Sequence, residues 1–143
     1  MLKIGIFGAG HLGKIHIEQW LKVEQAEVVG FYDPDNTNAS ATTERFGIRR
    51  YADADELIAA CTALDIVSTT TTHHYLVKKC VLAGKHVFVE KPLANTLEEG
   101  LELVNLVHEA NVKCQVGHVE RYNPALQALG DQEMHPMFIE AHR

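Results

Sequence analysis

The stretch that decides the fold is KIGIFGAGHLG, residues 3–13. Its first half is an apolar run that predicts a buried strand over Ile4–Phe7. The strand leads directly into Gly8-Ala9-Gly10-His11-Leu12-Gly13, which has the G-x-G-x-x-G spacing of a dinucleotide-binding turn. The residues that follow, through Val23, are predicted to form a helix. We expect the free N–H groups at the start of this helix to hold the phosphates of a dinucleotide.

Three glycines and a downstream acid supply the context that this spacing needs. Gly8 permits a tight turn, Gly10 lets a pyrophosphate approach the backbone, and Gly13 lets the helix pack closely on the sheet. A second apolar run, VVGFYD, ends at Asp33, where a carboxylate would accept hydrogen bonds from the adenosine ribose. The alternative for the loop is a glycine-rich turn without a ligand. The alternative for Asp33 is a turn cap before Pro34.

Composition excludes several classes of protein. The chain has 143 residues, a net charge of −6 and no basic run, which argues against a nucleic-acid or acidic-membrane partner. It shows no signal peptide, and no apolar run approaches the ~20 residues of a membrane span. The three cysteines are dispersed, which predicts reduced thiols in a cytoplasmic protein and no metal site.

Alternating strand and helix patterns predict an α/β fold, a doubly wound (Rossmann), mostly parallel six-stranded sheet with helices on both faces. The predicted strands are Ile4–Phe7, Glu27–Tyr32, Ile48–Tyr51, Leu64–Ser68, His86–Val89 and Val112–Val116. The predicted helices after the first are 35–46, Ala54–Cys61, 75–83, one that starts at a capping box on Thr96, and Ala125–Gly130.

Two further expectations concern the second half of the chain. In the helix that starts at Thr96 we expect one apolar face, formed by Leu97, Leu101, Val104 and His108 and widened by Leu103 and Val107. After a linker over 131–136, Met137–Ile139 has the pattern of another strand. Such a strand either joins this sheet or begins a further part of a longer protein.

Several motifs resemble the N-terminal, dinucleotide-binding half of the glucose–fructose oxidoreductase / inositol dehydrogenase / MocA (Gfo/Idh/MocA) family. The residues that carry the resemblance are Gly8-x-Gly10-x-x-Gly13, Asp33, the threonine run before His73-His74, AGKHVFVEKP over 83–92, and Gly117-His118. The run HVERYNPA over 118–125 is similar to the branch that acts on nucleotide-linked amino sugars, such as UDP-N-acetylglucosamine 3-dehydrogenases.

The chain departs from this family in two places. Many members carry Thr-Pro after the fourth strand, whereas Thr69–Thr72 contains no proline. The segment to Gly84 is also compatible with being a residue shorter than in the family, so His73 and His74 compete for the family's histidine position. The family's second domain, with its Asp-x-x-x-His run, does not follow in these 143 residues. We expect residues 1–117 to form the dinucleotide-binding domain and 118–143 to form a crossover segment and the start of a missing substrate domain.

The resemblance implies NAD as cofactor, with NADP disfavoured because a carboxylate at Asp33 repels a 2′-phosphate and no arginine directly follows it. The expected cofactor-binding residues are Gly8, Ala9, Gly10, His11, Leu12, Gly13, Asp33, Thr69, Thr70, Thr71, His73, His74, Glu90, Lys91 and Pro92. The alternative for the threonines is a strand exit that caps the next helix. A metal pair at His73 and His74 is disfavoured because adjacent helical residues point in different directions.

The resemblance also implies that Lys91 is the catalytic residue, contacting a substrate hydroxyl beside the nicotinamide. Burial and the cationic ring would lower the lysine pKa there, and a cis bond at Pro92 would fix the direction of its side chain. The alternative is a surface lysine before a turn. His118, Arg121 and Tyr122 are the expected substrate-pocket residues.

Together these features predict the NAD(P)-binding domain of an oxidoreductase that moves a hydride between a nicotinamide cofactor and a hydroxyl carbon of a sugar, sugar nucleotide or cyclitol. We expect the chain alone to bind cofactor weakly and to turn nothing over. The full-length form is expected to be a cytoplasmic homo-oligomer, because the family commonly associates through its second domain. The alternative is a stand-alone NAD(H)-binding regulatory or redox-sensing module, which would need no lysine at the nicotinamide.

Overall fold

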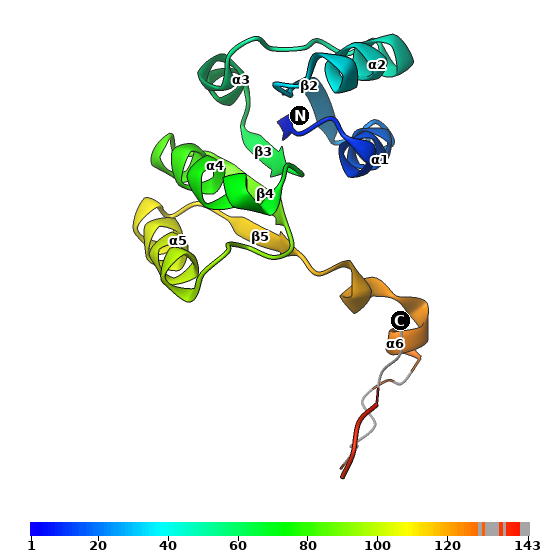
Figure 1. The fold of residues 1–143 in the computed structure, drawn as a ribbon, viewed down its shortest axis with the longest axis vertical. Helices are drawn as coiled ribbons and strands as arrows, with labels where there is room; N and C mark the ends of the chain where they lie inside the picture. The colour runs from blue at the N-terminus through cyan, green and yellow to red at the C-terminus, as the bar shows by residue number, and fades with distance from the viewer. Residues whose placement is uncertain (129, 131–134, 136, 141–143) are drawn as a thin grey trace.

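A computed structural model describes residues 1–128, 130, 135 and 137–140. Among these residues, five parallel strands form one sheet in the order β2-β1-β3-β4-β5 (Figure 1). The strands are β1 (Leu2–Phe7), β2 (Ala26–Tyr32), β3 (Ala63–Ile66), β4 (His86–Glu90) and β5 (Cys114–Gly117). The order reverses between β1 and β3, which is the switch point where doubly wound folds bind their ligands. The predicted α/β class is confirmed.

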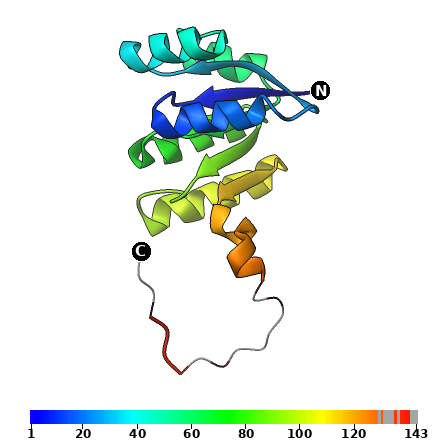
Figure 2. The same ribbon diagram turned by 90° about the vertical axis from the view of Figure 1, so that its right-hand side faces the viewer.

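Helices cover both faces of the sheet. They are α1 (His11–Trp20), α2 (Asn36–Phe46), α3 (Ala54–Ala60), α4 (Thr70–Leu82) and α5 (Leu97–Ala110). The first two lie on one face and the other three on the opposite face (Figure 1). After β5, a 3₁₀ turn η1 (Val119–Tyr122) and the short α6 (Pro124–Gln127) extend beyond the sheet edge (Figure 2).

Alternation along β1 divides the apolar residues between two cores. Ile4 and Ile6 face α1 and α2, where they pack with Ile17 and Phe31. Phe7 points to the other face, into a larger core that contains apolar residues of α3, α4 and α5. Because both faces are covered, strands such as β3 are buried at every position, as expected of a parallel sheet.

Polar residues fix the helix boundaries. The side chain of Asp35 accepts a hydrogen bond from the Asn38 amide at 2.8 Å and so caps α2, which ends at Gly47 in the left-handed conformation, φ 66°. The capping box predicted at Thr96 is present, with Glu99 as its partner. The local capping box explains why the start of α5 could be predicted from sequence.

The expected third strand, Ile48–Tyr51, is reduced to one bridge. Only Arg50 pairs with β2, opposite Phe31, while the Phe31 amide donates to the Arg49 carbonyl and the Tyr51 amide donates to the Phe31 carbonyl. Two residues after Tyr51, Asp53 caps α3, so the chain leaves the sheet edge and enters the helix. The sheet therefore has five strands among the described residues rather than six.

Two helix predictions are also corrected. Helix α4 begins at Thr70 and not at Tyr75, because the threonines form its first turn instead of a loop. In α5 only part of the expected apolar face is buried. Leu97 is 73% exposed, Leu101 55% and Val104 58%. Leu103, expected at the margin of this face, is 1% exposed and Val107 is partly buried, so the helix packs through that margin.

Beyond β5, the described residues depart from the predicted elements. Within the helix expected over Ala125–Gly130, the described residues form only the four-residue α6. The expected strand Met137–Ile139 is not a strand, and its side chains are exposed. Most of the linker expected over 131–136 lies outside the described residues. In the described part of the chain, no helix combines the length and apolarity that crossing a bilayer requires.

Candidate functional site

The glycine loop lies at the carboxyl end of β1, and two of its glycines are required by geometry. Gly8 has φ +99°, and a Cβ there would lie 2.8 Å from the Val67 carbonyl oxygen. A Cβ on Gly13 would overlap the carbonyl oxygen of Gly8. Helix α1 can therefore begin directly under the loop only because Gly13 has no side chain, as the sequence predicts.

Gly10 differs from these two because a Cβ there would have no heavy atom within 4 Å. Its position faces open space, which leaves room for a ligand to approach the backbone. Gly10 is also the N-cap of α1 and offers no side-chain acceptor to the first-turn amides. The N-terminus of α1, with its partial positive charge, is thus available to an anionic group.

Asp33 ties this loop to β2. One carboxylate oxygen accepts a hydrogen bond from the Ala9 amide at 2.7 Å, and the other accepts from the Asp35 amide at 2.8 Å. The side chain is only 6% exposed, yet it lines the cavity described below. A carboxylate has about four acceptor sites, so two remain for ligand hydroxyls. The turn-capping alternative and the ligand-binding interpretation are therefore compatible.

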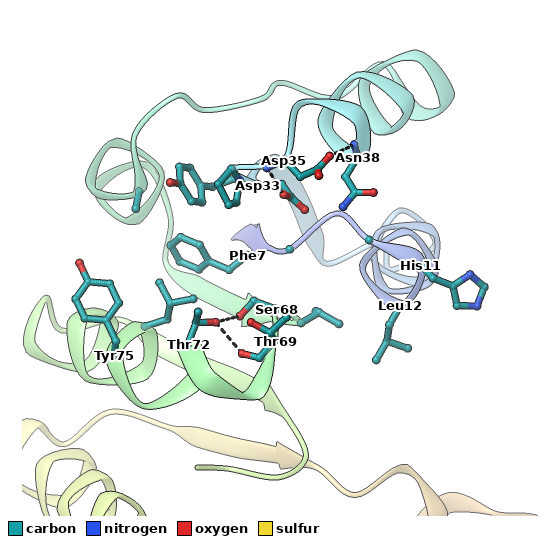
Figure 3. A pocket seen from close by; sticks show the side chains of 17 residues that line it. Phe7, His11, Leu12, Asp33, Asp35, Asn38, Ser68, Thr69, Thr72 and Tyr75 are labelled. Carbon is teal, nitrogen blue, oxygen red and sulfur yellow. Dashed lines mark hydrogen bonds between the residues drawn. The ribbon is translucent and has the colours of Figure 1, made fainter. Parts of the chain in front are cut away.

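A cavity of about 720 Å³ opens at the carboxyl ends of β1, β2 and β3. This volume falls within the roughly 300–1,000 Å³ of small-molecule and cofactor sites. In Figure 3, Asp33 and Asp35 lie on one side of it, and Ser68, Thr69 and Thr72 lie on the other. The lining residues are Phe7, Gly8, Gly10, His11, Leu12, Tyr32, Asp33, Pro34, Asp35, Asn38, Ala54, Val67, Ser68, Thr69, Thr72, Tyr75 and Leu76.

The second wall is the start of α4. Thr69 is the N-cap but makes no side-chain capping bond, so the first turn of α4 is also uncapped by a side chain. Thr72 donates its hydroxyl to the Thr69 carbonyl at 2.8 Å and lies 2.7 Å from the Ser68 hydroxyl. Two such helix starts, those of α1 and α4, thus meet at one cavity. Thr70 and Thr71 are not among its lining residues.

The two adjacent histidines are separated, as expected for neighbours on a helix. The His73 ring is buried, with Nδ1 2.8 Å from the Pro92 carbonyl oxygen and Nε2 3.1 Å from the Ser68 carbonyl oxygen. His74 is on the outer surface, where it pairs with Glu102 at 2.7 Å. Neither lines the cavity. His73 instead joins the segment around Pro92 to the start of α4.

The segment after β4 lies outside the cavity lining. Glu90 is buried at 7% exposure, whereas Lys91 and Pro92 are exposed. The described residues therefore do not supply the burial expected around Lys91. The Lys91–Pro92 peptide bond is cis. The residues expected at the substrate, His118, Arg121 and Tyr122, are also exposed, in or next to η1.

Sequence reasoning missed two groups. Arg50 donates a guanidinium N–H to the Asp33 carbonyl oxygen at 2.8 Å, although it does not line the cavity. His16 lies between the buried carboxylates of Asp65 and Glu90. Both are long-range contacts, and neither residue forms part of a motif, so only the fold reveals them.

With the geometry established, comparisons with known proteins define the family. A family model described as the oxidoreductase family with an NAD-binding Rossmann fold matches residues 2–118. The chain belongs to this family. The glycine loop, Asp33 and the cavity between them are thus parts of an NAD-binding Rossmann fold, as the resemblance implies.

Individual relatives agree with this assignment. The chain is 29% identical over 143 residues to a UDP-N-acetylglucosamine 3-dehydrogenase from Acidithiobacillus ferrooxidans, covering 99% of this chain and 45% of the relative. It is 37% identical over 134 residues to an inositol 2-dehydrogenase from Klebsiella pneumoniae, covering 90% and 40%.

Solved structures share the fold. The Acidithiobacillus enzyme has a TM-score of 0.84 at 29% identity, covering 90% of this chain and 42% of that one. A scyllo-inositol dehydrogenase from Lactobacillus casei, solved with NAD(H) and scyllo-inositol, has a TM-score of 0.83 at 28% identity, covering 90% and 39%. The chain spans less than half the length of each of these relatives.

Proposed function

We propose that this chain is the cofactor-binding half of an NAD-dependent dehydrogenase that oxidises or forms a hydroxyl-bearing carbon of a sugar, sugar nucleotide or cyclitol. The observation that carries the proposal is the cavity itself, where the glycine loop, Asp33 and the start of α4 meet at the switch point. NAD, when bound, supplies the hydride acceptor or donor. The relatives named above support the substrate class.

In this proposal the backbone carries most of the cofactor. The amides at the start of α1 hold the diphosphate, and the open space at Gly10 admits it. Asp33 uses its two remaining acceptor sites for the adenosine ribose hydroxyls. Ser68 and Thr69 contact the middle of the cofactor from the opposite wall.

The charges in the cavity favour NAD over NADP. Asp33 and Asp35 both line it, and none of its lining residues is a lysine or arginine. A 2′-phosphate beside these carboxylates would be repelled. Arg50 lies close by, but its guanidinium donates to the Asp33 backbone carbonyl. We therefore expect NADH to bind more tightly than NADPH.

The chemistry is assigned to Lys91, which follows the carboxyl end of β4. In the proposed enzyme its ammonium orients the substrate hydroxyl by donating a hydrogen bond or, as the neutral amine, the same group accepts the hydroxyl proton during oxidation. Because Lys91 is exposed here, a second domain has to enclose it and contribute the remaining substrate contacts. His118, Arg121 and Tyr122 are proposed to line that shared pocket, and residues 118–143 to lead into the second domain.

Two finer assignments belong to the same proposal. The run HVERYNPA over 118–125 supports a nucleotide-linked amino sugar as substrate, in agreement with the Acidithiobacillus relative. We also propose a cytoplasmic location, because all three cysteines are free thiols. The complete enzyme is proposed to be a homo-oligomer.

A second candidate is a stand-alone NAD(H)-binding regulatory module. The exposure of Lys91 and of the η1 residues favours it, since such a module needs no enclosed lysine. Both candidates require the same cofactor site. Addition of a second domain distinguishes them, because only the enzyme should gain turnover with a sugar or cyclitol substrate.

The test of the cofactor site is a calorimetric titration with NADH and, separately, NADPH. We expect NADH to bind more tightly than NADPH. Asp33→Asn should reduce the ratio of the two affinities by about tenfold, which corresponds to about 1.4 kcal/mol. The matched control is Asp55→Asn, which removes the same charge from an exposed residue paired with Lys79. Equal affinity for both cofactors, or no binding of either, would contradict the proposal.

A further inference from the structure

A buried polar cluster lies on the α1 side of the sheet, outside the cavity. Asp65 in the middle of β3 and Glu90 at the end of β4 are the two carboxylates, at 0% and 7% exposure. His16, one turn after Gly13 in α1, lies between them. Its ring also contacts Phe88 of β4, with centroids 5.9 Å apart.

The distances place an acceptor on each ring nitrogen of His16. Nδ1 is 2.9 Å from Asp65 Oδ2, and Nε2 is 3.4 Å from Glu90 Oε1. The Trp20 indole N–H donates to the same Asp65 oxygen at 2.7 Å. A neutral imidazole has only one N–H, so only the doubly protonated ring can donate to both carboxylates.

Glu90 is occupied as an acceptor on its other side as well. Its Oε2 accepts the backbone amide of Lys91 at 3.2 Å. A Cβ on Gly117 would lie 2.7 Å from Glu90 Oε1, so β5 closes over the carboxylate. Glu90 thus connects the His16 ring to the backbone amide of Lys91.

Electrostatics agree with this arrangement. Burial disfavours the charged ring, but the hydrogen bond and charge of Asp65, followed by those of Glu90, outweigh it and raise the pKa of His16 above its ordinary 6.5. Two buried carboxylates without a cation would be strongly unfavourable. Among the described residues, no group donates a hydrogen bond to Asp65 Oδ1. The buried carboxylate is therefore stabilised by the contacts of its other oxygen, Oδ2, with His16 and Trp20.

We propose that His16 is a positioning residue, a cationic bridge that Asp65 and Trp20 orient and that holds Glu90, and through it the Lys91 backbone, against the sheet. Its role toward Lys91 in catalysis rests on the proposed function, but the bridge itself does not. His73 holds the same segment from its other end, through the Pro92 carbonyl. The backbone on both sides of Lys91 is therefore fixed by histidines from two different helices.

The experiment is a side-chain ¹⁵N NMR titration of the histidines in the 143-residue protein, with His16→Gln used to assign the His16 signals. We expect both His16 nitrogens to be protonated below a midpoint that lies above 6.5. Glu90→Gln keeps the shape and removes the charge, so it should lower this midpoint. Glu102→Gln, which removes the same charge from the surface pair with His74, should not change it.

The positioning role has its own readout in the same titration. The Lys91 amide signal should shift with the His16 midpoint in the wild-type protein and should lose this shift in His16→Gln. A wild-type His16 with an unprotonated Nε2 at acidic pH would overturn the bridge, because the ring would then have no N–H directed at Glu90. A Lys91 amide insensitive to His16 would overturn the positioning role. Neither result depends on cofactor binding, which the calorimetric titration tests separately.

Discussion

Replacing Gly13 with alanine should destabilise the domain, whereas the same replacement at Gly10 should leave it folded and weaken NADH binding. The two glycines are three residues apart in one loop, so the substitutions are matched in chemistry and location. They differ in what the new methyl group meets. At Gly13 it would overlap the Gly8 carbonyl oxygen and lie 2.8 Å from the Gly8 carbonyl carbon, whereas at Gly10 it would meet nothing within 4 Å.

The magnitudes follow from these surroundings. The atoms that Gly13→Ala would displace belong to the backbone, so we expect about 3 kcal/mol, the upper part of the range for overpacked sites. In a domain of this size that corresponds to a decrease in Tm of about 10 °C. Gly10 has φ −68°, which alanine adopts readily. Alanine lowers the conformational entropy of the unfolded chain, which stabilises the folded protein by about 0.4–1 kcal/mol. This gain should roughly offset the loss that arises because alanine is a poorer N-cap than glycine.

Chemical denaturation and NADH calorimetry of both variants form the assay. Gly10→Ala should stay within about 0.5 kcal/mol of the wild-type stability and bind NADH at least about tenfold more weakly, because its methyl group occupies the space assigned to the diphosphate. A stable Gly13→Ala variant would refute the packing argument. A Gly10→Ala variant that binds NADH normally would refute the assignment of this loop to the phosphates.

Three further predictions concern packing and titration. Leu103→Ala should lower the free energy of unfolding by about 2–5 kcal/mol in denaturation experiments, because Leu103 is buried. Leu101→Ala, at an exposed position of the same helix, should change it by no more than about 0.5 kcal/mol. Similar losses in the two variants would contradict the assigned buried face of α5. Cys80 and Cys61 should resist a thiol reagent at pH 8 until the protein unfolds, since burial raises their pKa values to about 12 and about 11; rapid labelling of the native protein would contradict this. The raised pKa of His16 means that its contribution to stability is full below the unfolded value of 6.5 and is lost as pH rises through the folded value. Between pH 6.5 and the pKa of His16 in the folded protein, the wild type should therefore lose stability relative to His16→Gln. Parallel plots of stability against pH for the two proteins would count against the bridge.

The parts of the fold that sequence could predict are those with local causes. The G-x-G-x-x-G loop and the capping box at Thr96 each depend on residues within a few positions of one another. The alternation of buried strands with helices then leaves few topologies. The cavity at the switch point follows from that topology, so its position in the fold could be predicted.

The errors arise where tertiary contacts choose between local alternatives. Helix α5 has one broad apolar face, and its packing beside α4 buries the margin with Leu103 instead of the centre with Leu101. Helical spacing gives the extent of the face but not which part of it is buried. The segment around Arg50 likewise has the composition of a strand, but it lies beside β2 for only one residue pair.

The polar bridge was not predictable from the sequence because its partners are distant. His16 and Asp65 are 49 positions apart, and an aspartate in an apolar strand carries no signal of its own. Arg50 reaches the Asp33 carbonyl across 17 positions. Such contacts depend on the register of neighbouring strands, which the pattern of single segments does not fix.

The most direct test of the central claim is a crystal structure of this protein grown with NAD⁺. The account predicts the diphosphate at the start of α1 beside Gly10, and the adenosine ribose hydroxyls within hydrogen-bond distance of the Asp33 carboxylate. A cofactor bound elsewhere on the protein, or its absence from this cavity at saturating NAD⁺, would contradict the account.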